Sequence, residues 1–295
     1  MTKPVNHPLA PGAWLGLLGG GQLGRMFCMA AQSIGFKVCV LDPADNGPAA
    51  SVADRHIQAD YLDEKALAEL GELCDACTTE FENVPAASLQ FLAGHCLVSP
   101  GHHAVSIAQD RIAEKAFISQ CELSPAPWAP VQSADDLTQI DRALLPGILK
   151  VARLGYDGKG QARVDNAEQA RDAFTRFGEV PCVLEARQDL LTELSVVVAR
   201  SFTGETAAYP VSENEHRDGI LAVSNVPARV DPDLALRATA ATVRIAHTLE
   251  YVGVLCVEFF VINGDELLVN ELAPRPHNSG HYTIDACLTS QFEQQ

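Results

Sequence analysis

The sequence has little positive charge. Its 295 residues include 21 Lys and Arg against 38 Asp and Glu, which gives a formal net charge of −17 at pH 7. Proteins bind the phosphates of nucleic acids by neutralising them with Lys and Arg. We therefore expect no nucleic-acid partner, although an anionic small molecule can still bind where the few basic residues gather.

The sequence also lacks long apolar runs, although 47% of its residues are hydrophobic. No run approaches the 18 residues of a membrane span, and the N-terminus lacks the basic-then-apolar pattern of a signal peptide. These absences predict a cytoplasmic protein with no membrane partner. A chain of this length is too long for one simple core, so we expect two or three domains.

Cysteines occur in an odd number, nine. Several fall inside predicted helices or strands, which suits buried, reduced thiols better than a disulfide framework. Cys74 and Cys77 form a Cys-x-x-Cys motif, but no second Cys or His pair stands at zinc-finger spacing. The motif by itself therefore does not predict a metal or redox site.

The N-terminal residues match a dinucleotide-binding fingerprint. A predicted strand at 14–18 leads into the Gly-x-Gly-x-x-Gly loop at 19–24, then a helix, then a strand at 37–41 that ends at Asp42. Glycines there let backbone N–H groups approach an anion closely. A tight turn without a ligand is the alternative, and the fingerprint alone does not specify NAD.

Helices and strands continue to alternate to about residue 106, which predicts that an α/β domain ends there. Glu80 and Glu82 follow the strand predicted at 76–79. The carboxyl ends of strands in an open α/β sheet border the ligand crevice. These glutamates could therefore face a ligand, or they could simply precede the next helix.

The middle of the chain gathers basic residues. A predicted helix at 106–121 carries Arg111 and Lys115 about one turn apart. Lys150 ends a short predicted strand, and a buried lysine needs an anion to stay charged. The segment 153–161 follows, with three glycines among basic residues. Its N–H and ammonium groups could close over phosphates, although a β-turn without a ligand is the alternative.

Three further polar residues stand beside predicted strands. Glu185 lies at the exit of a strand at 182–185, where it could bond a nucleotide amine or ribose, or be exposed. Glu193 opens the next predicted strand. The polar segment 212–219 predicts a loop, in which His216 faces either a ligand or solvent.

A hairpin near the C-terminus provides the main argument for a metal. Asn263-Gly264 separates two apolar runs, each with one carboxylate, Glu258 and Glu271. A two-residue turn places Glu258 opposite Val269, so that Glu271 is its diagonal neighbour on the same face. Two such carboxylates repel unless a cation lies between them, and Mg²⁺ prefers oxygen ligands of this kind. A three-residue turn would put the two glutamates on opposite faces.

A lysine on a strand, a flexible Gly-rich loop, a strand-end glutamate and a late pair of glutamates occur in this order in the ATP-grasp enzymes. The whole chain resembles the 5-(carboxyamino)imidazole ribonucleotide synthases of that superfamily. The resemblance rests on three segments, of which the last is the longest and most specific: Gly19-Gly20-Gly21-Gln22-Leu23-Gly24-Arg25-Met26, Gly155-Tyr156-Asp157-Gly158-Lys159-Gly160-Gln161, and Asn270-Glu271-Leu272-Ala273-Pro274-Arg275-Pro276-His277-Asn278-Ser279-Gly280-His281.

The resemblance implies a fold of the α/β and α+β classes. It comprises an N-terminal Rossmann-like domain at 1–106, a small ATP-grasp lid domain with the Gly-rich loop at 107–190, and a large ATP-grasp domain at 191–295. It also implies a carbon–nitrogen ligase, typically a homodimer, that uses ATP, Mg²⁺ (or Mn²⁺) and bicarbonate. The implied substrate is 5-aminoimidazole ribonucleotide, which is carboxylated on its exocyclic amine in purine biosynthesis.

Carried over position by position, the resemblance implies the following sites. ATP would be held by Arg111, Lys150, Gly155, Tyr156, Asp157, Gly158, Lys159, Gly160, Gln161, Glu185, Ala186, Arg187, Gln188, Glu193, His216, Asn270 and Glu271. The metal would be bound by Glu258 and Glu271. The substrates would be contacted by Gly21, Gln22, Leu23, Glu80, Arg275, His277, Asn278 and Ser279. Among all of these, Lys150, Glu271 and Arg275 would be catalytic.

Two alternatives to this ligase stay open. Family chains normally continue for several tens of residues beyond the position of Gln295, in a subdomain that helps grip the ribonucleotide phosphate. A chain that binds ATP without turnover is therefore one alternative. A nucleotide-dependent oxidoreductase is the other, although it leaves Lys150, the second Gly-rich loop and the paired glutamates unexplained.

Overall fold

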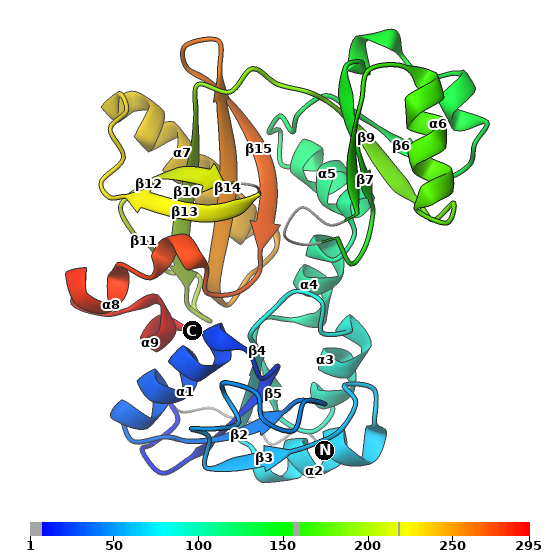
Figure 1. Ribbon diagram of the computed structural model, residues 1–295. Coiled ribbons are helices and arrows are strands. Elements are labelled where there is room, and N and C mark those ends of the chain that lie inside the picture. Colours follow the sequence, from blue (N-terminus) through cyan, green and yellow to red (C-terminus); the bar gives the residue numbers. More distant parts are fainter. Residues whose placement is uncertain (1–7, 156–159, 218) are drawn as a thin grey trace.

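The computed structural model describes residues 8–155, 160–217 and 219–295. The predicted ATP contacts at Tyr156, Asp157, Gly158 and Lys159 lie outside these ranges. Within the described ranges the strands form three sheets, which occupy separate parts of the molecule (Figure 1). None of the helices found there is long and apolar enough to cross a membrane.

The N-terminal part is a parallel sheet in the order β3-β2-β1-β4-β5. Helix α1 packs on one face, and α2, α3 and α4 contribute to the core on the other. The strand predictions at 14–18, 37–41 and 76–79 are confirmed. The elements are β1 (Trp14–Leu18), α1 (Gln22–Ser33), β2 (Lys37–Leu41), β3 (Arg55–Ile57), α2 (Glu64–Leu73), β4 (Ala76–Thr79), α3 (Ala86–Leu92), β5 (Leu97–Val98) and α4 (His102–Ala108).

The second part is a small antiparallel sheet in the order β6-β9-β7-β8, with α6 on one face. Helix α5 leads into it and lies near β9. The elements are α5 (Arg111–Gln120), β6 (Trp128–Val131), two short 3₁₀ turns (Asp136–Thr138 and Arg142–Leu144), β7 (Gly147–Val151), β8 (Gln161–Val164), α6 (Ala167–Arg176) and β9 (Cys182–Ala186).

The third part is a larger antiparallel sheet in the order β13-β12-β10-β14-β15, with β11 beside β10. Helix α7 covers one face (Figure 1), and buried residues of α4 and α5 join the core on that face. The elements are β10 (Thr192–Arg200), β11 (Thr206–Ala208), β12 (Ser212–Arg217), β13 (Ile220–Asn225), α7 (Pro232–Thr248), β14 (Gly253–Ile262), β15 (Glu266–Ala273), a 3₁₀ turn (Asn278–Gly280), α8 (Thr283–Ala286) and α9 (Gln291–Gln294).

Strand alternation explains how the large sheet presents polar groups. Leu255, Val257 and Phe259 of β14 join the core beneath α7. Side chains on a strand alternate between its faces, so Glu258 points to the opposite face. On β10, Ser195 lies directly across from Glu258 and shares that face. One face of this sheet therefore packs into the hydrophobic core, and the other presents polar side chains such as Ser195 and Glu258.

Two predictions of secondary structure were wrong. The helix expected at 106–121 is two helices, because Asp110 caps the second one by accepting hydrogen bonds from the N–H groups of Ile112 and Ala113. The segment at 212–219 is largely strand β12, which pairs with β10 and β13. Pairing with two neighbouring strands outweighed the low strand propensity of its polar residues.

Candidate functional site

A cavity of about 360 Å³ is lined by residues from all three parts of the molecule. It brings together many of the predicted site residues. These are Arg111, Lys150, Gly155, Gly160, Gln161, Glu193, His216, Glu258, Asn270, Glu271, Arg275, His277 and Asn278. Because basic, acidic and amide groups converge in one hollow, the cavity is the candidate ligand site.

The two glutamates of the hairpin face each other, but the predicted register is wrong. Ile262 pairs with Glu266, so the turn has three residues rather than two. That turn alone would put Glu258 and Glu271 on opposite faces. A register shift between Glu258 and Phe259 leaves Asn270 as an extra residue and makes Glu258 the direct partner of Glu271. The bulge thus restores the carboxylate pair that the longer turn would have separated.

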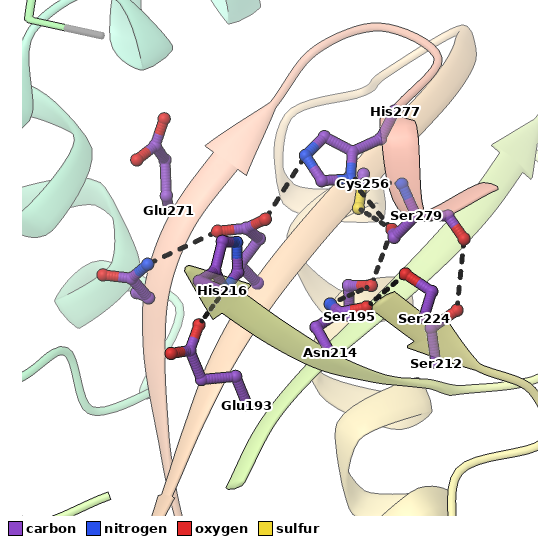
Figure 2. Close-up of polar contacts among 12 residues, drawn as sticks. Glu193, Ser195, Ser212, Asn214, His216, Ser224, Cys256, Glu271, His277 and Ser279 are labelled. Atoms are coloured by element: carbon purple, nitrogen blue, oxygen red, sulfur yellow. Dashed lines mark hydrogen bonds and ion pairs between the residues drawn. The ribbon is translucent and has the colours of Figure 1, made fainter. Parts of the chain in front are cut away.

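The acidic pair is electrostatically strained. Burial and the neighbouring Glu271 raise the pKa of Glu258 to about 7. His277 Nε2 lies 3.3 Å from Glu258 Oε1, and Asn270 donates to Glu258 Oε2 at 3.5 Å. In Figure 2, Glu271 lies at the left of this strand pair and His277 at its right. A cation placed at these two carboxylates would relieve their repulsion.

The donor set fits Mg²⁺. This ion takes one or two carboxylates and completes its shell with water and phosphate oxygens. The described residues hold no ready-made group of three or more His, Cys, Asp or Glu side chains that could cage a metal. Glu258 and Glu271 therefore suit a cation that arrives with an anionic ligand.

Lys150 forms an ion pair with the buried carboxylate of Glu185. Its Nζ is 2.7 Å from Glu185 Oε2, and Lys115 Nζ is 3.1 Å from Glu185 Oε1. Burial alone would raise the pKa of Glu185, but Lys150 and then Lys115 hold it at about 2. The anion that keeps Lys150 charged is thus supplied by the protein. The alternative that Glu185 is simply exposed at the strand exit does not hold, because only 3% of this residue is exposed.

Two arginines border the cavity. Arg111 Nη1 lies 3.3 Å from Glu271 Oε2, and Arg111 Nη2 donates to the carbonyl of Gly155, where the Gly-rich loop begins. Arg275 Nε lies 2.6 Å from Glu82 Oε2. Burial would raise the pKa of Glu82, but Arg275 lowers it below the usual value. Positive charge is therefore held on both sides of the acidic pair.

His216 faces the cavity from strand β12. Its Nδ1 lies 2.7 Å from Glu193 Oε2 on the neighbouring strand β10, as Figure 2 shows. That contact raises the pKa of His216, although burial opposes it. A histidine on a paired strand is placed firmly, which a residue in the expected loop would not be.

The Gly-rich loop at 19–24 already has an acceptor. Glu80 accepts hydrogen bonds from the N–H groups of Gly21 and Gly24, the second at 2.7 Å. A side chain at Gly21 would collide with this carboxylate, since a Cβ there would lie 2.5 Å from Glu80 Oε1. Asp42 accepts from Tyr61 Oη at 2.5 Å. The glycines thus admit a carboxylate from the same domain.

Some predicted residues do not line the cavity. Ser279 lies beneath it and is 1% exposed. Ala186, Arg187 and Gln188 are outside its lining, and Gln188 Nε2 donates to the carbonyl of Ala186. The loop residues Gly21, Gln22 and Leu23 are also elsewhere, around Glu80.

Several residues at the site were not assigned to it from the sequence, although Glu82 was considered as a residue that could face a ligand. Glu82 joins Arg275, and Lys115 joins Glu185. Ile148 and Phe260 add apolar lining to the cavity. They lie two residues from Lys150 and Glu258 on the same strands, so the two-residue period of a strand could have identified them.

Family models match both halves of the chain. Residues 13–109 match the ribonucleotide synthetase preATP-grasp domain, and residues 116–292 match the ATP-grasp domain. The second match covers more than half of the chain and contains the acidic pair, Lys150 and the Gly-rich loop that follows it. The expected ATP-grasp fold with its N-terminal domain is therefore confirmed.

Curated relatives agree with these matches. The chain is 47% identical to N5-carboxyaminoimidazole ribonucleotide synthase of Brucella melitensis, over 97% of this chain and 80% of that protein. It is 44% identical to the enzyme of the same name from Bacillus subtilis, over 100% of this chain and 77% of that one.

Solved structures give the same result. The N5-carboxyaminoimidazole synthetase of Staphylococcus aureus, complexed with ADP, has a TM-score of 0.91 and 40% identity over 97% of this chain and 76% of that one. The Aspergillus clavatus enzyme, in complex with ADP and 5-aminoimidazole ribonucleotide, has a TM-score of 0.88 and 29% identity over 96% and 75%. The chain belongs to the N5-carboxyaminoimidazole ribonucleotide synthase family of ATP-grasp enzymes.

Proposed function

We propose that the chain carboxylates the exocyclic amine of 5-aminoimidazole ribonucleotide, with ATP and bicarbonate as co-substrates, in purine biosynthesis. A bicarbonate oxygen attacks the γ-phosphorus of ATP, and ADP leaves with the electron pair of the broken P–O bond. The resulting carboxyphosphate passes its carboxyl group to the amine and releases phosphate. The amine loses one proton as the new C–N bond forms.

One observation supports this proposal most directly. A single cavity combines Lys150 and Arg111 with two carboxylates that repel each other. Phosphoryl transfer depends mainly on positioning and on neutralising charge. Such a cavity is suited to a triphosphate that arrives with a divalent cation.

Different residues of the chain would serve different parts of this reaction. Lys150 and Arg111 would contact ATP phosphates, and the loop from Gly155 to Gln161 would cover them. Glu258 and Glu271 would hold Mg²⁺, or Mn²⁺ in its place, which when bound neutralises phosphate charge. Arg275 is fixed by Glu82 and lies in the cavity lining. It would hold the bicarbonate-derived anion close to the amine.

The remaining assignments are also part of the proposal. His277 and Asn278 would face the bicarbonate and the imidazole, and Glu80 with Gly21 to Leu23 would lie near the ribonucleotide. We further propose a cytoplasmic homodimer. The domain limits of 1–106, 107–190 and 191–295 are kept as proposed.

Phosphate release tests the proposal. The rate should require 5-aminoimidazole ribonucleotide, ATP, bicarbonate and Mg²⁺ together. ATP binding measured by calorimetry without any phosphate release would instead support the alternative of a binding protein without turnover. Reduction of NAD by a candidate substrate, without ATP cleavage, would support an oxidoreductase. Family membership gives that last alternative no support.

A further inference from the structure

A chain of polar side chains, buried at its centre, links strands β13, β12 and β10 to the turn after β15 (Figure 2). It consists of Ser224 on β13, Asn214 on β12, Ser195 on β10, and Ser279 and His277 after β15. Ser195 and Ser279 are each 1% exposed, and Asn214 is 7% exposed. Buried polar groups at this depth must satisfy one another, because water does not reach them.

The contacts are continuous. Ser224 Oγ lies 2.8 Å from Asn214 Oδ1, and Asn214 Nδ2 lies 2.9 Å from Ser195 Oγ. Ser195 Oγ is 2.7 Å from Ser279 Oγ, which is 2.8 Å from His277 Nδ1. The ring then reaches Glu258 through Nε2 at 3.3 Å. The polar chain therefore ends on one member of the acidic pair.

Its direction is fixed by a backbone group. The N–H of Ser279 donates to His277 Nδ1 at 3.3 Å. A backbone N–H cannot accept, so Nδ1 carries no proton and the hydroxyl of Ser279 must donate to it. Ser279 Oγ has then used its single proton and must accept from Ser195.

Counting donors and acceptors in the same way orients the rest of the polar chain. Ser195 has given its proton to Ser279, so it accepts from the amide of Asn214, whose oxygen accepts from Ser224. With the amide of Asn214 reversed, Ser195 would have to donate to it. Ser279 would then donate to Ser195, and its oxygen would face the lone pair of Nδ1. Only one orientation satisfies every contact.

We propose that Ser279, oriented by Ser195 and Asn214, is a positioning residue that makes Nδ1 of His277 an acceptor and so places the ring proton on Nε2, 3.3 Å from Glu258 Oε1. Hydrogen bonds of this kind fix the direction in which a carboxylate presents its oxygens to a metal. The metal part of this inference rests on the Mg²⁺ site proposed above. The proton placement does not, since it follows from the hydrogen bonds alone.

Nitrogen NMR of the histidine rings tests the proton placement in metal-free protein. The signals of His277 are assigned by their loss in His277→Gln. Long-range ¹H–¹⁵N spectra should show the neutral form with the proton on Nε2. A proton on Nδ1, or an imidazolium ring at pH 7, would overturn the proposal. The protonation state is read in the unmodified protein, and only the assignment of the signals uses a variant.

Two variants test the positioning role. Ser279→Ala should shift the ring toward a mixture of tautomers, because Nδ1 keeps only the longer backbone contact. It should also weaken Mn²⁺ binding, measured by electron paramagnetic resonance, by about tenfold. Ser212→Ala is the matched control. Ser212 is equally buried, but its hydroxyl contacts the carbonyl of Ser279 at 3.4 Å rather than the chain to His277.

The control should leave both the tautomer and the Mn²⁺ affinity unchanged. Equal losses in the two serine variants would overturn the proposal, since they would indicate a general loss of packing. Glu258→Gln separates the two hypotheses. If it binds Mn²⁺ as tightly as the unmodified protein, the metal site is wrong, whereas the spectrum of His277 still supports or overturns the proton placement.

Discussion

The Gly-rich loop at 19–24 and the acidic pair of the hairpin both concentrate polar groups at one point, but the loop matches donors with an acceptor, whereas the pair sets two carboxylates against each other. Glu80 accepts from the N–H groups of Gly21 and Gly24. Glu258 and Glu271 instead face each other across two strands. The difference teaches that convergent donors or acceptors do not by themselves mark a ligand site. What marks it is like charge held together, because Glu258 and Glu271 still repel each other although Arg111 and His277 contact them.

The largest effect is expected at the acidic pair. Glu271→Gln should reduce turnover on the order of 10³-fold, because one carboxylate of the proposed metal site is lost. The fold should be intact, since the change also removes repulsion from Glu258. Phosphate release and thermal unfolding would be measured, with Glu266→Gln, an exposed glutamate on the same strand, as the control. An undiminished rate would remove the metal assignment.

Lowering the pH should destabilise the small sheet that contains Glu185 more than the Gly-rich loop at 19–24. The pKa of Glu185 is about 2 in the fold, below its usual value of 4.5, so its stabilisation is present above pH 4.5 and is lost as pH falls toward 2. The full loss should be about 3 kcal/mol, of which about 2 kcal/mol is reached at pH 3. Burial raises the pKa of Glu80, so its protonation has the opposite sign and favours the fold, and this effect develops as pH falls toward 4.5 from above.

Urea unfolding at pH 7 and pH 3 measures this difference. Glu185→Gln should flatten the pH dependence, because the group that titrates is gone. Glu80→Gln should not flatten it. If Glu185→Gln retained the full pH dependence, the lysines would not be holding this carboxylate in its charged form.

Removing Glu80, the acceptor of the loop, should lower the stability of the fold. Glu80→Ala leaves the N–H groups of Gly21 and Gly24 without their carboxylate, so the free energy of unfolding should fall by about 2 kcal/mol. Glu72→Ala, at an exposed position of helix α2, is the control and should change it by less than about 0.5 kcal/mol. Equal stabilities of the two variants would show that the loop does not depend on Glu80.

The smallest effect is expected from Lys150→Ala. Lys115 remains to neutralise Glu185, so the fold should survive, but ATP should bind about tenfold more weakly, which is about 1.4 kcal/mol. Calorimetric titration with ATP would measure this, and Lys65→Ala, on the exposed surface, serves as control. Unchanged ATP affinity would contradict the role of Lys150 at the phosphates.

The sequence predicted many elements well because their signals are local. The strand at 14–18, the glycines after it, and the helix that begins at Pro232 behind its Asp231 cap all follow from neighbouring residues. The hairpin itself was also predictable from Asn263-Gly264. Its register was not, because turn length and the bulge at Asn270 together decide which residues meet.

By itself, the sequence determined which residue types are available and the family to which their spacing belongs. It also determined most of the residues that line the cavity. Only the tertiary structure decided the partners: Glu80 with the first Gly-rich loop, Glu185 with two lysines, and His277 with the buried serines. Except for Ser279, which is close to His277 in the chain, those partners lie tens of residues or more apart, and the acidic pair depends on a one-residue shift in strand pairing. Electrostatic and hydrogen-bond energies depend on distance in space, which no local pattern encodes.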